Sequence, residues 1–238
     1  HRDLHSFPTR RSSDLRRLIG WDEILEGGLA PNATVMSWRG MSGGIAAARA
    51  GHDVVMSPGS HCYFDHYQGD PRQEPKAWGG YSTLENVYSF EPVPAELSQD
   101  QARHILGAQG NVWTEYMLTS DRVEYMVYPR ACALAEVVWS DAAQRDWDHF
   151  VKRMTSHYLR MDWMDINYRR PVLTGFGDRT LFVDQYVVTI KSPLTDMVVR
   201  YTLDGSNPTE ESRLYEGPFT VTKDCQVRAV GWFTNRIK

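Results

Sequence analysis

Short apolar runs alternate with helical stretches over the first two thirds of the chain. The apolar runs, each a candidate strand, lie at residues 18–21, 34–38, 53–57 and 104–107. Between the second and third runs, the alanine-rich segment from Gly44 to Ala50 predicts a short helix. Strands separated by helices predict a parallel α/β sheet, and repeated β-α units favour a (β/α)₈ barrel, of which only about four units are visible.

Two longer stretches show apolar residues at the three-and-four spacing of helices, at residues 121–138 and 144–164. Both are expected to be packing helices, with Trp139, Trp147 and Trp163 in the core or at helix interfaces. Pro171 follows the second helix and predicts a domain boundary, because proline cannot continue a helical hydrogen-bond pattern.

The pattern changes after Val172 to short alternating segments, as in antiparallel sheets. Candidate strands lie at residues 186–190, 198–203, 218–221 and 225–230, and Asp204-Gly205 is a turn signal. This pattern predicts a small antiparallel β-sandwich over residues 171–238. Residues 16–170 are expected to form the partial barrel.

The first fifteen residues have no apolar period. Their sequence resembles the translated read-through of a sequencing-adapter oligonucleotide, so residues 1–15 are expected to be a non-native scar outside the fold. We therefore expect the native protein to extend upstream of Arg16, and the absence of a leader sequence carries no information on localisation.

Composition excludes several classes of protein. The 238 residues are 42% hydrophobic and carry a net charge of −4, so a nucleic-acid-binding surface is unsupported. No apolar run approaches the roughly 20 residues that span a bilayer. The three cysteines are widely spaced, which argues against a disulfide framework and a zinc knuckle and favours isolated buried thiols.

Conspicuous side chains lie at or just after the end of each candidate strand. Trp21 and Trp38 end the first two, and the third runs into a polar, aromatic loop at residues 57–67. After the fourth, Trp113 and Glu115 are two apart and so point to one face of an extended segment. An indole that stacks on C–H groups beside a carboxylate that accepts from hydroxyls suits a sugar site. Buried core tryptophans and a solvated carboxylate are the alternative.

The loop after the third strand also contains residue types that bind zinc. These are His61, Cys62, Asp65 and His66. Their spacing matches no common metal motif, so no metal is assigned to the chain.

Four motifs in one order resemble the second half of the catalytic barrel of family 20 glycoside hydrolases, the β-N-acetylhexosaminidases. They are W-D-E-I at Trp21, M-S-W-R-G around Trp38, S-P-G-S-H-C-Y-F-D-H at residues 57–66, and G-N-V-W-T-E-Y at residues 110–116. The resemblance continues through the Y-P-R-A and A-E-V-V-W-S segments after Tyr128. Residues 200–209 resemble the C-terminal sandwich of chitobiase-like enzymes, for which a scaffold role is favoured over glycan binding.

The resemblance implies roles for individual residues. Trp21, Trp38 and Trp113 match the three tryptophans that line the pocket for the substrate's 2-acetamido group. Tyr63 matches the tyrosine whose hydroxyl hydrogen-bonds that group while the group attacks the anomeric carbon. In this mechanism the substrate's own acetamide is the nucleophile, so the enzyme supplies an acid and a carboxylate that orients the acetamide.

The same resemblance assigns carboxylates to binding and leaves the acid outside the chain. Asp65 and Glu115 match carboxylates that accept hydrogen bonds from hydroxyls of the terminal sugar. Asp22-Glu23 is an adjacent Asp-Glu pair, but it matches the family's W-D-E segment and not the catalytic pair, so both residues are expected to be structural. The catalytic pair is expected upstream of this chain.

These expectations combine into a hypothesis of function. The chain is expected to be an inactive fragment of a retaining β-N-acetylhexosaminidase that acts on terminal N-acetylglucosamine or N-acetylgalactosamine without a metal or cofactor. The competing class is a non-catalytic glycan-binding protein that keeps the pocket. Export from the cytoplasm is an expectation from the substrate class alone.

Overall fold

The structure is a computed structural model that describes residues 17–194 and 197–233. The adapter-like segment at residues 1–15 lies outside the described residues, so its interpretation stays a prediction. Contacts divide the chain into two compact units, residues 1–145 and 146–238. The domain boundary at Pro171, which the change of sequence pattern predicts, also stays a prediction.

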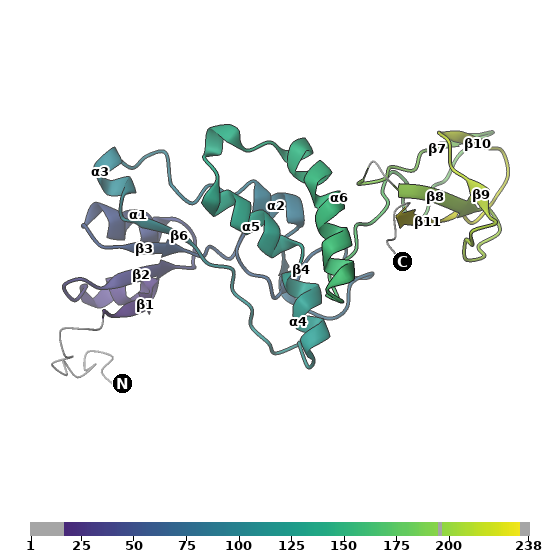
Figure 1. Cartoon of the computed structure of the whole chain (residues 1–238). Helices are drawn as coiled ribbons and strands as arrows, with labels where there is room; N and C mark the ends of the chain where they lie inside the picture. The colour runs from purple at the N-terminus through teal and green to yellow at the C-terminus, as the bar shows by residue number, and fades with distance from the viewer. Residues whose placement is uncertain (1–16, 195–196, 234–238) are drawn as a thin grey trace. The chain divides into compact units, whose positions relative to one another are not determined.

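The first unit contains a parallel sheet of four strands in the order β1-β2-β3-β6 (Figure 1). Their bounds are Ile19–Trp21 for β1, Thr34–Ser37 for β2, Val54–Met56 for β3 and Ile105–Ala108 for β6. All three pairings are parallel. The four predicted strands and their parallel arrangement are therefore confirmed.

A short helix connects two of these strands. Helix α1 spans Ser42–Arg49, between β2 and β3, which confirms the predicted alanine-rich helix. Gly44 in α1 lies so close to the sheet that a Cβ atom there would be 2.6 Å from Met56 Cε. Val35, Val54 and Met56 of the sheet are fully buried beside it. The small residues of α1 thus permit close packing of the helix on the sheet.

The connection between β3 and β6 is more structured than the sequence suggested. It contains a two-stranded parallel sheet, in which β4 spans His66–Tyr67 and β5 spans Trp78–Tyr81, and the short helices α2 (Leu84–Tyr88) and α3 (Gln99–Ala102). The helices have no long apolar period, but each begins at a hydroxyl cap. Thr83 caps α2 and Ser98 caps α3.

The single helix predicted at residues 121–138 is wrong. The structure has two helices there, α4 (Ser120–Val127) and α5 (Arg130–Trp139), with Tyr128 in an extended conformation between them. Pro129 explains the break, because it has no N–H to donate and disfavours helical geometry at the residue before it. A 3₁₀ turn, η1, spans Asp22–Gly27 directly after β1.

The second unit combines one helix with antiparallel strands. Helix α6 spans Trp147–Trp163 and is capped by the side chain of Asp146; a 3₁₀ turn, η2 (Ala142–Gln144), precedes it near the end of the first unit. One antiparallel sheet pairs β7 (Tyr186–Val188) with β10 (Phe219–Val221), and a second has the order β11-β8-β9. The bounds in the second sheet are Met197–Thr202 for β8, Arg213–Leu214 for β9 and Arg228–Phe233 for β11. Residues of both sheets share one apolar cluster, which includes Val188, Val199 and Val221.

Two tryptophans and one cysteine that the sequence predicted to be buried are exposed. Trp139 is 90% exposed and Trp163 is 87% exposed, so their predicted burial is wrong for this structure. Among the cysteines Cys62 is buried, Cys132 is half-buried and Cys225 is exposed, and none forms a disulfide. Apolar periodicity places a residue on a helix face but does not supply the surface that covers it.

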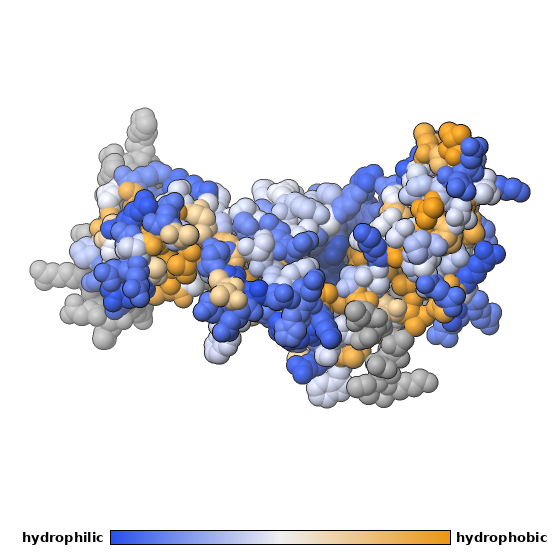
Figure 2. All heavy atoms as spheres, turned by 90° about the horizontal axis from the view of Figure 1, so that it is seen from above, coloured by the Kyte–Doolittle hydropathy of each residue, from blue (hydrophilic) through white to orange (hydrophobic). Residues whose placement is uncertain are grey.

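The molecular surface is mixed in polarity. Figure 2 shows hydrophilic residues over much of the face in view, interrupted by hydrophobic patches. Within residues 17–194 and 197–233, no helix has the length and apolar character needed to cross a bilayer.

Candidate active site

The predicted site residues follow the C-terminal ends of the four parallel strands. Trp21 is the last residue of β1, and Trp38 comes directly after β2. Tyr63 and Asp65 lie in the loop after β3, and the segment at residues 113–115 follows β6. Because the strands are parallel, these ends share one edge of the sheet, where α/β folds place their sites.

The aromatic side chains of these strand ends contact one another in pairs. The ring centroids of Trp21 and Trp113 are 6.0 Å apart, and those of Trp38 and Tyr63 are 6.3 Å apart. Each pair joins a residue from the β1-β2 side to a residue from the β3-β6 side. The structure therefore brings four of the six residues that the sequence singled out into two pairs, each with a direct ring contact.

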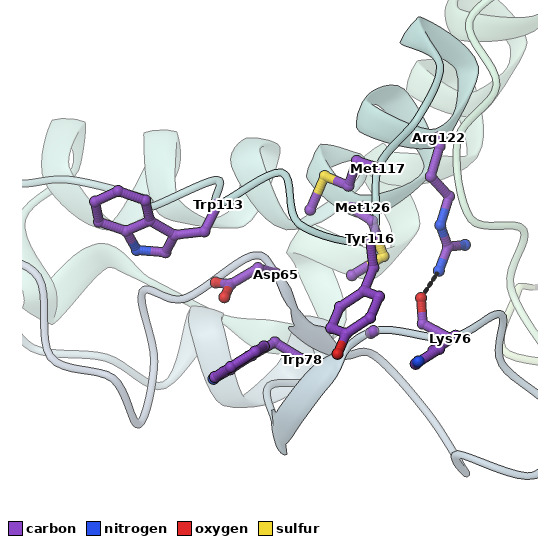
Figure 3. Close-up of a pocket in the computed structure, with 9 residues that line it drawn as sticks. Asp65, Lys76, Trp78, Trp113, Tyr116, Met117, Arg122 and Met126 are labelled. Carbon is purple, nitrogen blue, oxygen red and sulfur yellow. Dashed lines mark hydrogen bonds between the residues drawn. The ribbon is translucent and has the colours of Figure 1, made fainter.

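Asp65 lies in a surface pocket that Trp113 also lines. Figure 3 shows its carboxylate in the region between the rings of Trp113 and Trp78. Asp65 is 4% exposed, and its Oδ1 atom has no hydrogen-bond partner among the described residues. A buried acceptor oxygen without a partner is costly unless a ligand satisfies it, so the position suits a hydroxyl donor.

The electrostatic surroundings of Asp65 make it a weak acid. Burial raises the pKa of Asp65 to about 6, and the negative charge of Glu115 contributes to this rise. The guanidinium of Arg130 acts in the opposite direction. Glu115 itself is exposed, so the structure places it within electrostatic range of Asp65 but shows no direct contact between the two.

Tyr63 keeps its proton at neutral pH. Burial raises the pKa of Tyr63, the charge of Asp65 adds to the effect, and hydrogen bonding to Trp113 and Asn111 opposes it. A neutral phenol can donate a hydrogen bond to a carbonyl or amide oxygen. Its loop is held in place by the Phe64 N–H, which donates to the Asn111 carbonyl at 2.7 Å.

Arg130 stabilises that loop through hydrogen bonds to its backbone. The side chain of this residue is fully buried at the start of α5 and donates to four backbone carbonyls, those of Phe64, His66, Ser82 and Met126. Its guanidinium also lies 5.0 Å from the ring centroid of Phe64. In the sequence this arginine was noted only as part of a family motif. Hydrogen bonds from a side chain to distant backbone carbonyls cannot be predicted from residue spacing.

The adjacent carboxylates of Asp22 and Glu23 each contact a residue that follows β2. Arg39 Nε lies 2.7 Å from Asp22 Oδ1. The indole Nε1 of Trp38 lies 3.0 Å and 3.1 Å from the two carboxylate oxygens of Glu23. Asp22 is 2% exposed. Both carboxylates thus have partners within the protein, and their structural role stays a prediction.

The metal alternative finds no support in the loop after β3. Burial raises the pKa of the Cys62 thiol to about 12, which disfavours the thiolate that binds metals. The His61 ring stacks on Phe90 at a centroid distance of 5.1 Å. In the part of the chain that the structure describes, no group of three or more His, Cys, Asp or Glu residues is arranged to hold a metal ion.

The structure adds pocket residues that sequence reasoning missed. Trp78, on β5, is 50% exposed and lies 6.0 Å from the ring centroid of Tyr116. Lys76 places its Nζ 4.5 Å from the same Tyr116 ring (Figure 3). Both come from a segment without apolar periodicity. The only available signal was the tryptophan itself, within a polar loop.

Comparison with known proteins agrees with this geometry. Residues 5–142 match the family described as glycosyl hydrolase family 20, catalytic domain, and residues 181–234 match the chitobiase/beta-hexosaminidase C-terminal domain. A beta-hexosaminidase from Porphyromonas gingivalis is 49% identical over 221 residues, which are 90% of this chain and 28% of the relative. A beta-N-acetylhexosaminidase from Cellulomonas fimi is 33% identical over 60% of this chain and 29% of its own.

Solved structures of family 20 enzymes also resemble this chain. The GH20 exo-beta-N-acetylglucosaminidase from Vibrio harveyi in complex with N-acetylglucosamine matches with a TM-score of 0.60 and 32% identity, over 65% of this chain and 25% of that one. The GH20 beta-N-acetylhexosaminidase from Streptomyces coelicolor matches with a TM-score of 0.58 and 27% identity, over 65% and 33%.

These matches define the class of fold as the α/β type of the TIM barrel. The chain belongs to glycosyl hydrolase family 20. It spans between a quarter and a third of the length of the relatives just named.

Proposed function

We propose that this chain is the sugar-binding part of a β-N-acetylhexosaminidase, an enzyme that removes terminal, non-reducing N-acetylhexosamine residues from glycans. Two ring pairs at the strand ends, Trp21–Trp113 and Trp38–Tyr63, carry the proposal, together with a buried acceptor carboxylate, Asp65, that lines a pocket with Trp113. Aromatic faces suit the C–H surface of a sugar and an apolar slot suits an acetamido methyl group. The names of the relatives point the same way.

In this proposal the three tryptophans line the acetamido pocket and Tyr63 orients the acetamide through its neutral hydroxyl. Asp65 and Glu115 accept hydrogen bonds from hydroxyls of the terminal sugar. The acetamide of the substrate acts as the nucleophile, so the reaction is retaining and substrate-assisted and uses no protein nucleophile. No cofactor is required by this scheme.

The residues of the proposed pocket do not include the general acid of the reaction. Both oxygens of Glu23 accept from the Trp38 indole, and Asp22 is buried in an ion pair with Arg39. We propose that the Asp-Glu pair of the mechanism belongs to another part of the native enzyme, and that this chain forms the C-terminal half of a (β/α)₈ barrel followed by a small β-sandwich. Export of the enzyme to where such glycans occur is part of the same proposal.

The test compares this chain with the complete enzyme, meaning the native polypeptide that includes it. Both are assayed on a chromogenic N-acetylglucosaminide and on the galacto epimer. We expect turnover by the complete enzyme only, because loss of general acid catalysis alone lowers the rate by about 10²- to 10⁴-fold. Turnover by the chain alone that Asp22→Asn or Glu23→Gln abolishes would show that this pair is the catalytic one.

A second arm separates hydrolysis from glycan binding. If the complete enzyme binds N-acetylglucosamine but does not turn over either substrate, the protein belongs to the competing, glycan-binding class. Glu115→Gln in the complete enzyme is expected to lower kcat/KM and to change the preference between the two epimers. The matched control is Glu85→Gln, a change at an exposed residue of α2 outside the strand ends, which should leave both unchanged.

A further inference from the structure

We infer that Glu23 is a positioning residue that fixes the indole of Trp38, and thereby sets the enzyme's discrimination between acyl groups of different size on the sugar nitrogen. This inference deepens the proposed function and rests on it. Glu23 belongs to the W-D-E segment, whose carboxylates the proposed reaction does not use.

The contact between Glu23 and Trp38 is directional and uses both carboxylate oxygens. The indole Nε1–H faces the carboxylate, with distances of 3.0 Å and 3.1 Å to its two oxygens. An ionised acceptor makes a stronger hydrogen bond than a neutral one. An indole has only one donor, so this contact selects one orientation of the ring plane.

A second contact holds the same two strand ends together. Asp22 accepts from Arg39 Nε at 2.7 Å and from the Arg39 backbone N–H at 3.3 Å. Gly43 leaves room for the buried Asp22 carboxylate, because a Cβ atom at that position would lie 2.9 Å from Asp22 Oδ2. Two consecutive carboxylates after β1 thus bind two consecutive residues after β2.

The backbone around Trp38 is fixed independently of Glu23. The Ser37 hydroxyl donates to the Gly40 carbonyl at 2.7 Å and accepts from the Gly44 N–H at 2.8 Å. The Gly59 N–H donates to the Trp38 carbonyl at 3.0 Å. Loss of the Glu23 carboxylate should therefore release the ring and leave the chain path unchanged.

Ring orientation matters because Trp38 also contacts Tyr63, at a centroid distance of 6.3 Å. In the proposed function Trp38 is one wall of the slot for the acetamido methyl group. A slot with a fixed wall excludes a longer acyl chain, whereas a wall that can rotate admits it. One additional methylene in an apolar pocket changes discrimination by about 10- to 200-fold.

The test measures kcat/KM of the complete enzyme on N-acetyl- and N-propionylglucosaminides. We expect the native enzyme to prefer the acetyl substrate and Glu23→Ala to lose at least about tenfold of that preference. Glu23→Gln keeps an acceptor oxygen on a side chain of the same length and should retain the preference. Glu26→Gln is the matched control, since Glu26 contacts Arg39 at 2.9 Å but not Trp38.

A double-variant cycle checks that the effect passes through the indole. Trp38→Phe removes the N–H donor, so Glu23→Ala should change the acyl preference no further in that background. Glu23 is exposed, so its truncation leaves no buried cavity and the variant should fold. An unchanged acyl preference in Glu23→Ala, with the native enzyme active, overturns this inference alone. An enzyme inactive on every N-acylhexosaminide overturns the proposed function.

Discussion

The indole rings of Trp21 and Trp113 lie 6.0 Å apart, although their strands are the two outermost strands of the sheet. In the order β1-β2-β3-β6, two further strands separate them. The segment after β6 must therefore run across the strand ends toward β1. This crossing makes one wall out of residues that are far apart in the sequence and at opposite edges of the sheet.

A double-mutant cycle on these two rings tests that wall. In the complete enzyme, Trp21→Ala and Trp113→Ala should each weaken binding of N-acetylglucosamine, because each removes apolar contact area from the sugar. Their effects should be non-additive by about 0.5–1.5 kcal/mol, the range for an aromatic pair. Titration calorimetry gives the four binding constants. Strictly additive effects would mean that the rings do not act together.

The buried carboxylate of Asp65 predicts an unusual dependence of stability on pH. Its pKa of about 6 lies above the ordinary value of 3.8, so the fold favours the protonated acid. Below the ordinary value the raised pKa contributes stability, and this contribution is lost as the pH rises through 6. Asp65→Asn, which is neutral throughout, should therefore stabilise the enzyme at pH 7.5 by on the order of 2 kcal/mol.

Thermal unfolding at a series of pH values measures this effect. The gain in Tm from Asp65→Asn should shrink as the pH falls from 7.5 toward 4, while sugar binding weakens at pH 7.5. Asp70→Asn is the control of opposite sign, because Arg72 lowers the pKa of Asp70 to about 2 and the ion pair is exposed. A gain from Asp65→Asn that is constant with pH would exclude the charge as its cause.

The fork of hydrogen bonds from Arg130 predicts a large stability effect. Arg130→Met would leave buried carbonyls without donors, and each such group costs about 1–3 kcal/mol. We expect a total loss above about 3 kcal/mol, and only partial rescue by Arg130→Lys, because an ammonium cannot form the planar fork. Denaturant unfolding of the complete enzyme measures both variants.

Arg122 offers a matched control for that variant. Its guanidinium also donates to two backbone carbonyls, those of Pro75 and Lys76, both at 2.8 Å. These bonds are exposed, so water can replace the lost donor in Arg122→Met. A loss as large for Arg122→Met as for Arg130→Met would contradict the argument from burial.

Most strands of both units could be predicted because they have a local signature. Four short apolar runs gave the parallel sheet, and alternation after Val172 gave most of the antiparallel strands. The break at Pro129 was visible in the sequence, yet apolar periodicity on both sides favoured one helix. The short strands β4 and β5 depend on pairing partners outside themselves, so no local pattern marks them.

The family resemblance identified the candidate site residues and their roles, because residue spacing alone does not show what a side chain binds. Position after a strand explains why Trp38 and Tyr63 meet, since parallel strand ends share one edge. The partners that hold them, Glu23 and Arg130, were not identifiable as such. Their role depends on which side chain faces which atom, and the sequence carries no direct record of that.

The open edges of the sheet predict the behaviour of this chain in isolation. Among the residues that the structure describes, strands β1 and β6 are each paired on one side only, and Leu18, Ile19 and Leu106 in or beside them are more than half exposed. Unpaired strand edges with exposed apolar side chains promote aggregation. The purified chain should therefore elute as aggregates in size-exclusion chromatography. A monomeric peak with a cooperative unfolding transition would contradict this prediction.

The hydroxyl of Tyr63 allows the most direct separation of catalysis from binding. Tyr63→Phe in the complete enzyme keeps the ring and its contact with Trp38 and removes the phenolic hydroxyl with its hydrogen bonds, including the proposed bond to the acetamide. If that bond to the acetamide tightens as the acetamide attacks the anomeric carbon, it stabilises the transition state more than the bound substrate. The variant should then lower kcat by about tenfold or more, with little change in KM.

Steady-state kinetics on the chromogenic N-acetylglucosaminide distinguishes this role from simple sugar binding. A hydroxyl that binds substrate and transition state equally would raise KM and leave kcat unchanged, and that result would remove Tyr63 from the catalytic step. Tyr81→Phe is the control, because its phenol is 59% exposed on β5. Because burial raises the pKa of Tyr63, the hydroxyl stays a donor throughout the neutral range. The loss of kcat in Tyr63→Phe should therefore be the same at pH 6 and pH 8.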